Sequence, residues 1–247
     1  MRELSQLIDV EEPAWPELRE TLDASPVSVE VLPPDSDLGR ASILQLRVTV
    51  RSYLGAVVLH CGGLLVDDGW LRVFGSPASG AAHGVPGLAG INQFPGTFDP
   101  TWQPETGLVV AHDVLGGVFA LNGAALDSGA PAGAARPGAP GEVVYFAPDS
   151  LRWEALGVGH STWLAWLVSG ALDEFYAGLR WPGWKEEIRA LNSNQGLAFF
   201  PPLWSAEAGQ DIPATSRRVV PMRELLDVAR DSCRQFDGVD PGFLGAV

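Results

Sequence analysis

Short apolar runs separated by glycine, aspartate and proline dominate the middle of the chain. The runs at 109–111, 118–122 and 143–147 are rich in valine and aromatic residues, and turn-forming residues flank them. Short β-branched and aromatic runs with this punctuation are typical of strands rather than helices. We therefore expect these three runs to form the middle of one antiparallel sheet.

Two further patterns extend the expected sheet towards the N-terminus. Valine alternates with polar residues over 27–31, which indicates a half-buried strand. Apolar runs at 64–66 and 70–74 flank the sequence Asp67-Asp68-Gly69. Because an Asp-Gly pair between two apolar runs is a strong hairpin signal, we expect these two runs to pair.

Helical periodicity and capping signals occur on both sides of this region. The segments expected to be helical are 4–8, 15–22, 37–46, 52–60, 161–168, 172–179, 185–191 and 222–236. Residues 197–200 and 218–220 indicate two more strands before the last helix. Gly62 is expected to end the helix over 52–60 in the left-handed conformation, and residues 238–247 are expected to fray.

Two long segments, 75–104 and 123–141, are rich in glycine, alanine and proline and are expected to be loops. Because no polar linker separates two cores, we expect 1–247 to be a single domain with elaborations at both ends. Together the patterns predict an α+β fold. A central, mainly antiparallel sheet is flanked by helices, with an extra helix, two strands and a helix at the C-terminus.

The net charge of the chain limits the classes of molecule that it is expected to bind. The 247 residues contain 30 acidic side chains against 16 lysines and arginines, a formal net charge of −14. A chain this acidic repels phosphate backbones, so we do not expect nucleic-acid binding. The same field would attract a basic protein, although an acidic surface also serves solubility alone.

The N-terminus and the cysteines indicate a compartment. Charged residues interrupt the N-terminal stretch where a signal peptide would be apolar, and no apolar run approaches the ~20 residues of a membrane span. We therefore expect a cytoplasmic protein without a membrane partner. In a reducing cytoplasm Cys61 and Cys233 are expected to be small buried hydrophobes rather than a disulfide.

The sequence offers little for catalysis. The histidines do not share a spacing typical of metal ligands, the Gly62-Gly63 and Gly116-Gly117 pairs do not fit a phosphate loop, and no Gly-x-Ser-x-Gly motif is present. We predict no catalytic residues, no metal and no cofactor. Asp113 and Asp149 follow expected strands and could act as an acid and base pair, but we favour hydrogen bonding within turns.

Several motifs, taken in order, resemble a known superfamily. They are a helix ending at Gly62-Gly63, a hairpin containing Trp70, the segments 109–122 and 143–150, and a helix beginning at Ser161. Over about 44–175 this set resembles the SUKH superfamily of cell-wall regulators and toxin-immunity proteins. Trp181-Pro182-Gly183-Trp184 and Phe199-Phe200-Pro201 resemble more closely the uncharacterised bacterial family DUF2625.

The superfamily resemblance implies helices around an antiparallel sheet and a non-enzymatic role in binding a partner, often a polymorphic toxin. It places Asp113, Gly116 and Gly117 in a turn between strands, and Tyr145 with Asp149 in the next strand and turn. The 75–104 loop, the 123–141 insertion and the extra C-terminal residues depart from that pattern.

Two functional hypotheses follow. The first is an immunity-type binding module whose acidic surface meets a basic protein such as a toxin. The second is a small-molecule or carbohydrate-binding protein, or a hydrolase, with tryptophan and aspartate side chains lining a cleft. The residues expected to contact a partner or ligand are Trp70, Asp113, Gly116, Gly117, Asp149 and Trp153. An accessory protein with neither a toxin nor a substrate is a third possibility.

Overall fold

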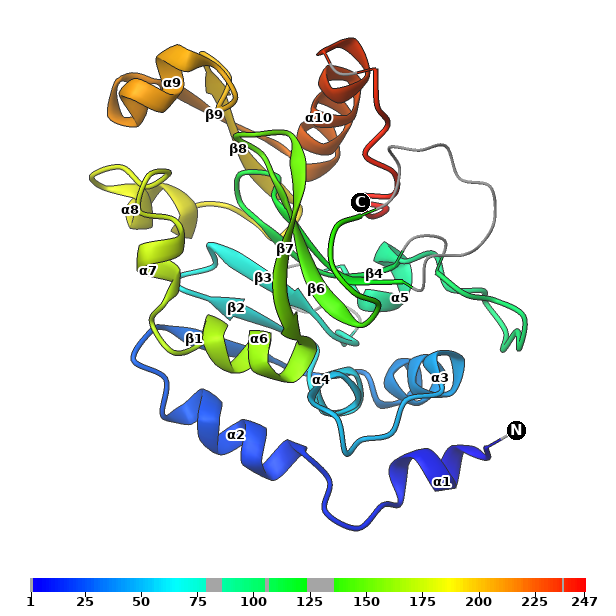
Figure 1. Cartoon of the computed structure of the whole chain (residues 1–247). Helices are drawn as coiled ribbons and strands as arrows, with labels where there is room; N and C mark the ends of the chain where they lie inside the picture. The colour runs from blue at the N-terminus through cyan, green and yellow to red at the C-terminus, as the bar shows by residue number, and fades with distance from the viewer. Residues whose placement is uncertain (1, 79–85, 105–106, 124–135, 237) are drawn as a thin grey trace.

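The computed structural model describes residues 2–78, 86–104, 107–123, 136–236 and 238–247 (Figure 1). It is an α+β structure with a seven-stranded antiparallel sheet, whose strands follow one another in chain order, and a second sheet of two strands. This confirms the expected fold class, including the helix, two strands and helix at the C-terminus.

Every strand of the large sheet is antiparallel to its neighbours. The strands are β1 (Val29–Leu32), β2 (Gly63–Val66), β3 (Leu71–Phe74), β4 (Gly107–Asp113), β5 (Val118–Asn122), β6 (Glu142–Ala147) and β7 (Arg152–Gly159). The sequence analysis did not identify β7 as a strand. Because β7 lies at one edge of the sheet, most of its side chains are exposed and it lacks the apolar run that marks the other strands.

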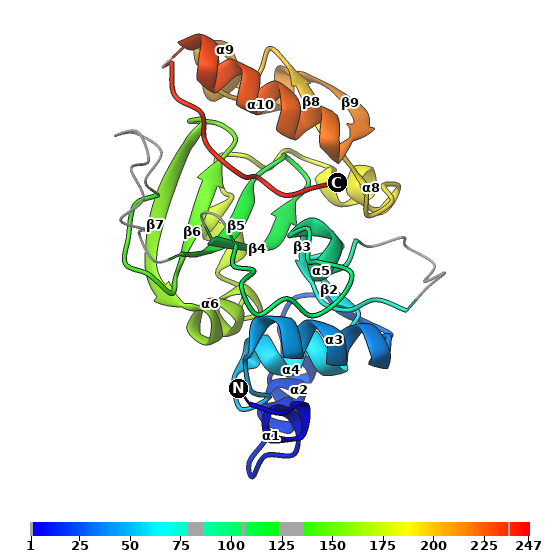
Figure 2. The same ribbon diagram turned by 90° about the vertical axis from the view of Figure 1, so that its right-hand side faces the viewer.

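The N-terminal helices occupy one end of the molecule, and the smaller sheet occupies the other together with the last two helices, with the large sheet between the two ends (Figures 1 and 2). The helices are α1 (Leu4–Ile8), α2 (Trp15–Asp23), α3 (Ser36–Leu46), α4 (Tyr53–His60), α5 (Leu88–Ile91), α6 (His160–Leu167), α7 (Leu172–Phe175), α8 (Trp184–Arg189), α9 (Ala206–Gln210) and α10 (Met222–Phe236). Within the described ranges, no helix combines the length and apolar composition needed to cross a lipid bilayer.

The C-terminal unit consists of β8 (Gln195–Phe200), β9 (Ser216–Pro221) and α10. Its helix buries Leu226, Ala229 and Cys233 on one face and packs against both strands. The unit is joined to the large sheet, because the Leu197 N–H donates to the Val114 carbonyl at 2.8 Å.

One continuous hydrophobic cluster includes residues of the large sheet, the surrounding helices and the C-terminal unit. Its largest fully buried members include Trp70, Trp163 and Phe119. Cys61 and Cys233 are both buried free thiols, as expected from the sequence.

The prediction that residues 238–247 fray is wrong. Leu244 is fully buried and its carbonyl contacts Nε2 of His112 at 3.0 Å, while the Ala246 N–H donates to the Ile91 carbonyl at 2.9 Å. The tail therefore packs on the sheet and α5, because its apolar side chains and backbone groups find partners there. The glycines and proline of the tail are typical of an unpacked segment, so the sequence did not predict this packing.

The prediction that Gly62 ends a helix in the left-handed conformation is also wrong. Gly62 is absent from the residues with positive φ. A Cβ at this position would instead lie 2.2 Å from the Pro33 carbonyl oxygen. Close approach of two backbone segments, rather than a left-handed helix end, is what requires glycine here.

The two expected loops are described in part. The segment 75–104 contains the short helix α5, which the sequence analysis missed, and Phe94 packs against Trp102 at a ring distance of 4.6 Å. Much of the 123–141 segment, residues 124–135, lies outside the described residues. At its end, Asn122 donates to the Gly138 carbonyl at 2.9 Å.

Candidate functional site

Asp113 lies at the end of β4, fully buried, where its carboxylate accepts four hydrogen bonds. The donors are the hydroxyls of Tyr145 at 2.8 Å and Tyr176 at 2.9 Å, and the N–H groups of Leu115 at 2.9 Å and Gly117 at 2.8 Å. Burial raises the pKa of Asp113, and these hydrogen bonds oppose the increase. The bond from Leu115 confirms that this aspartate organises a turn.

Gly116 and Gly117 have different structural roles in this turn. Gly116 has a φ of 90° and lines an apolar groove beside Leu225. A Cβ on Gly117 would lie 2.1 Å from Oδ2 of Asp113 and 2.5 Å from the Tyr145 hydroxyl. Gly117 thus leaves the space in which the Asp113 carboxylate is bound.

Trp70 is fully buried, so its ring packs in the interior of the protein and is not part of its surface. It contacts Tyr176 and Trp184 at ring distances of 5.2 and 5.0 Å. The guanidinium of Arg180 lies 4.8 Å from the Trp70 ring and 4.2 Å from the Trp184 ring. This cluster joins the β2–β3 hairpin to α7 and α8.

The six residues expected to contact a partner are not brought together into one surface. Asp113 and Tyr145 are joined by a hydrogen bond, and Gly116 and Gly117 belong to the same turn. Asp149 is exposed at the β6–β7 turn. Trp153 instead binds the C-terminal tail, donating from Nε1 to the Pro241 carbonyl at 2.8 Å. These positions leave no cleft that combines Trp70, Asp113, Asp149 and Trp153.

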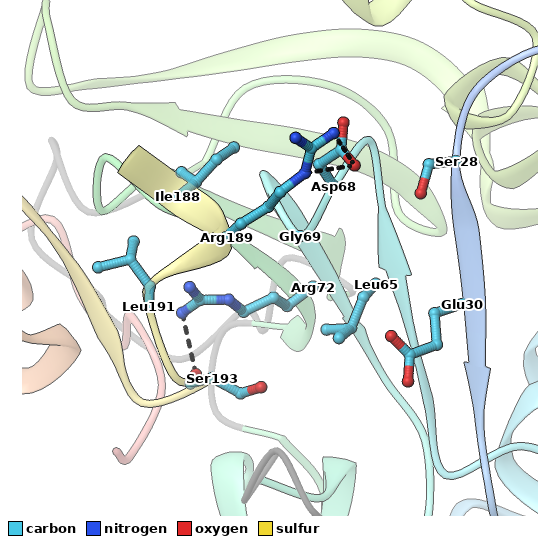
Figure 3. Close-up of a pocket in the computed structure, with 10 residues that line it drawn as sticks. All are labelled: Ser28, Glu30, Leu65, Asp68, Gly69, Arg72, Ile188, Arg189, Leu191 and Ser193. Atoms are coloured by element: carbon cyan, nitrogen blue, oxygen red, sulfur yellow. Dashed lines mark hydrogen bonds and ion pairs between the residues drawn. The ribbon is translucent and has the colours of Figure 1, made fainter. Parts of the chain in front are cut away.

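A cavity of about 230 Å³ lies elsewhere, over the β1–β3 end of the large sheet (Figure 3). The sheet register places Glu30 opposite Leu65 and Leu65 opposite Arg72, so these three side chains form a row across β1, β2 and β3. Ile188 and Arg189 of α8 line the cavity from the other side (Figure 3). Two cations and two carboxylates, Asp68 and Glu30, therefore border it.

Arg72 is the most buried charge of this cavity, with 3% of its surface exposed. Its Nη1 donates to the carbonyl oxygens of Ser193 at 3.0 Å and Gln195 at 2.5 Å. Burial lowers the pKa of Arg72 to about 10, partly offset by the nearby Asp113 charge, so the guanidinium remains protonated at neutral pH. Among the described residues, no carboxylate forms an ion pair with it.

Ion pairs fix α8 beside the cavity. Arg189 lies 3.0 Å from Asp68, and Lys185 lies 3.4 Å from the same carboxylate. The buried carboxylate of Asp67 binds Arg180, whose side chain is 8% exposed. The wall of the cavity is therefore attached to the β2–β3 turn that forms its floor.

The sequence analysis did not single out Arg72. One signal was present, since Arg72 interrupts the apolar run 70–74 of an expected strand. A charge in such a run is rarely buried without a hydrogen-bonding partner. Its partners Ser193 and Gln195 lie more than a hundred residues away in the chain, so their proximity could not be predicted.

A second feature is the acidic end of the molecule formed by α1, α2 and the residues next to them, at the bottom of Figure 1, which we call the acidic face. Its exposed carboxylates are Glu3, Asp9, Glu11, Glu12, Glu17, Glu20 and Asp23. Residues 2–23 contain only two basic side chains, Arg2 and Arg19, and Arg19 lies 2.8 Å from Asp23. Leu7 and Leu18 are fully buried and hold both helices against the core.

Comparisons with known proteins identify the family. The family model described as "Protein of unknown function DUF2625" matches residues 4–225. The chain is 38% identical over 228 residues to "Putative uncharacterized protein YbfG" of Escherichia coli, covering 92% of this chain and 95% of that protein. It is 32% identical over 203 residues to an "Uncharacterized protein" of Haemophilus influenzae, covering 82% and 83% of the two chains. The chain therefore belongs to the DUF2625 family of proteins of unknown function.

Proposed function

We propose that this protein is a non-enzymatic binding module that recognises a basic protein through the acidic face of α1 and α2. The observation that carries the proposal is the concentration of seven exposed carboxylates within residues 3–23. Exposed carboxylates concentrated at one end of a molecule attract a basic surface and accelerate the encounter. Such a face can select a partner without containing a reaction centre.

The resemblance to the SUKH superfamily narrows the proposed partner to a toxin that this chain neutralises in the cytoplasm. The superfamily's antiparallel sheet with surrounding helices is compatible with the fold described above. Neutralisation needs only a stable complex, so it makes no demand for catalytic residues. The C-terminal unit and the packed tail are additions to that simple plan.

The alternative of a hydrolase with a tryptophan and aspartate cleft receives less support from the geometry. Asp113 is surrounded by four donors and Trp70 is fully buried. A carboxylate that acts on a substrate must reach the reacting atoms. We therefore do not propose catalysis by these residues.

The proposal is tested by affinity capture from the native host with three forms of the protein. The wild type is compared with a variant in which Glu11, Glu12, Glu17 and Glu20 are replaced by glutamine. The matched control replaces Asp149, Glu154, Glu174 and Glu207, exposed acids at other places, by their amides. Both variants lose the same number of charges.

We expect one basic protein, encoded beside this chain, to form a one-to-one complex with the wild type and the control. The acidic-face variant should retain it at least about tenfold less well, because four favourable charges are lost. Equal retention by both variants, or capture of no protein, would contradict the proposal.

A further inference from the structure

We propose that the cavity between β1–β3 and α8, defined here as the Arg72 pocket, binds a small molecule with one carboxylate and a short apolar chain. This site lies outside the acidic face and does not depend on the proposed function. The inference rests on one buried cation, the apolar side chains around it and the charges at the mouth.

The cation is the guanidinium of Arg72, which lines the cavity and points towards Ser193 (Figure 3). Its hydrogen bonds to described residues all use Nη1, and their acceptors are two neutral carbonyl groups. The N–H groups on Nη2 and Nε remain for a ligand. A guanidinium binds a carboxylate through charge-assisted hydrogen bonds, which are roughly twice as strong as neutral ones.

The pocket itself is held in place before a ligand enters. Arg72 is fixed by the two carbonyl groups, and the ion pair of Arg189 with Asp68 attaches α8 to the floor. Less ordering is then required on binding, which favours affinity for a small ligand.

Apolar side chains line the same pocket. Leu65 lies next to Arg72 on the floor, and Ile188 and Leu191 lie on the opposite wall (Figure 3). A volume of about 230 Å³ is smaller than the ~300–1,000 Å³ of pockets for drug-sized ligands. The pocket therefore suits an acid with only a few carbon atoms.

Charges at the mouth limit the charge of the ligand. Glu30 and Asp68 both border the pocket, and Arg189 and Lys185 are already paired with Asp68. Arg72 is then the pocket cation that has no ion-paired carboxylate among the described residues, so a second negative charge on the ligand would lose its hydration without a matching cation. This arrangement favours a monocarboxylate over a phosphate or a dicarboxylate.

The test is a titration of the full chain followed by amide chemical shifts in NMR spectra. Hexanoate is the probe, hexanamide is its neutral isostere and inorganic phosphate is the competing oxyanion. We expect hexanoate to shift the resonances of Gly69 and Ser193 saturably below about 10 mM. Hexanamide and phosphate should each bind at least about tenfold more weakly, because one lacks the charge and the other carries too much.

Variants assign the effect to the pocket. Arg72→Gln should weaken hexanoate binding at least about tenfold, whereas Arg218→Gln, which removes an exposed arginine of β9, should leave it unchanged. Since Arg72 also supports the 193–195 segment, Leu65→Trp provides a second variant that fills the pocket and keeps the guanidinium. Val219→Trp, on the exposed part of β9, is its matched control.

Equal affinity for hexanoate and hexanamide would overturn the inference, as would tighter binding of phosphate. Failure of hexanoate to saturate the pocket resonances, or unchanged binding by Leu65→Trp, would overturn it as well. None of these results depends on the capture of a protein partner, so this inference and the proposed function can fail separately.

Discussion

The buried carboxylate of Asp113 and the buried guanidinium of Arg72 organise their surroundings through hydrogen bonds. Asp113 shows this most clearly, since two tyrosine hydroxyls and two backbone N–H groups converge on one carboxylate. A buried charge is stable only with such partners. The same residue in the sequence suggested both a turn and a catalytic acid, and its surroundings distinguish the two.

Gly117→Ala tests the space around this carboxylate. The added Cβ would meet Oδ2 of Asp113 at 2.1 Å, so we expect the free energy of unfolding to fall by about 2–4 kcal/mol. Gly178→Ala is the control, because no atom lies within 4 Å of its added Cβ. Urea denaturation measures both, and an equal effect of the two substitutions would show that Asp113 tolerates displacement.

Two buried histidines predict a loss of stability in acid. Burial lowers the pKa of His112 and of His160 to about 4, whereas an unfolded histidine titrates near ~6.5. Between these values the unfolded chain binds more protons, so stability is lost as the pH falls from 6.5 to 4. Each histidine contributes at most about 3 kcal/mol to this loss.

Urea denaturation over this pH range checks the prediction. The double variant His112→Gln/His160→Gln should show a much shallower decline than the wild type, because the two titrating groups are gone. An unchanged slope would assign the acid sensitivity to other groups. His60→Gln is the control, since His60 is less buried and its pKa is lowered less.

Strands and helices were predictable wherever apolar periodicity is strong. The hairpin flanking Asp67-Asp68-Gly69 and the long helix α10 both follow local patterns that survive in the fold. The edge strand β7 and the short helix α9 carry few apolar residues, so no such pattern marked them. Contacts distant in the chain, such as Arg72 with Ser193, leave no local trace at all.

The packing of the C-terminal tail, which its composition does not indicate, leads to a prediction about stability. Leu244 is fully buried, so Leu244→Ala should reduce the free energy of unfolding by about 2–4 kcal/mol through lost burial and a residual cavity. Val247→Ala is the control, because Val247 is 37% exposed and should change stability by less than about 0.5 kcal/mol. Thermal or urea unfolding of both variants provides the comparison, and equal stabilities would mean that the tail contributes no packing energy.

The whole molecule is unevenly charged. Residues 2–23 contain seven acidic and two basic side chains, whereas residues 180–230 contain six acidic and seven basic ones. These segments lie towards opposite ends of the molecule, on either side of the large sheet (Figure 1). An approaching basic protein would therefore be drawn preferentially to the end that carries α1 and α2.

The salt dependence of the association rate with the captured partner tests this role most directly. For the wild type, we expect the rate constant to fall at least about tenfold between roughly 50 and 300 mM NaCl, because salt screens exposed charges. The variant lacking Glu11, Glu12, Glu17 and Glu20 should associate more slowly at low salt and show little salt dependence. A wild-type rate that does not change with salt, or an equal slope in the variant, would contradict recognition through the acidic face.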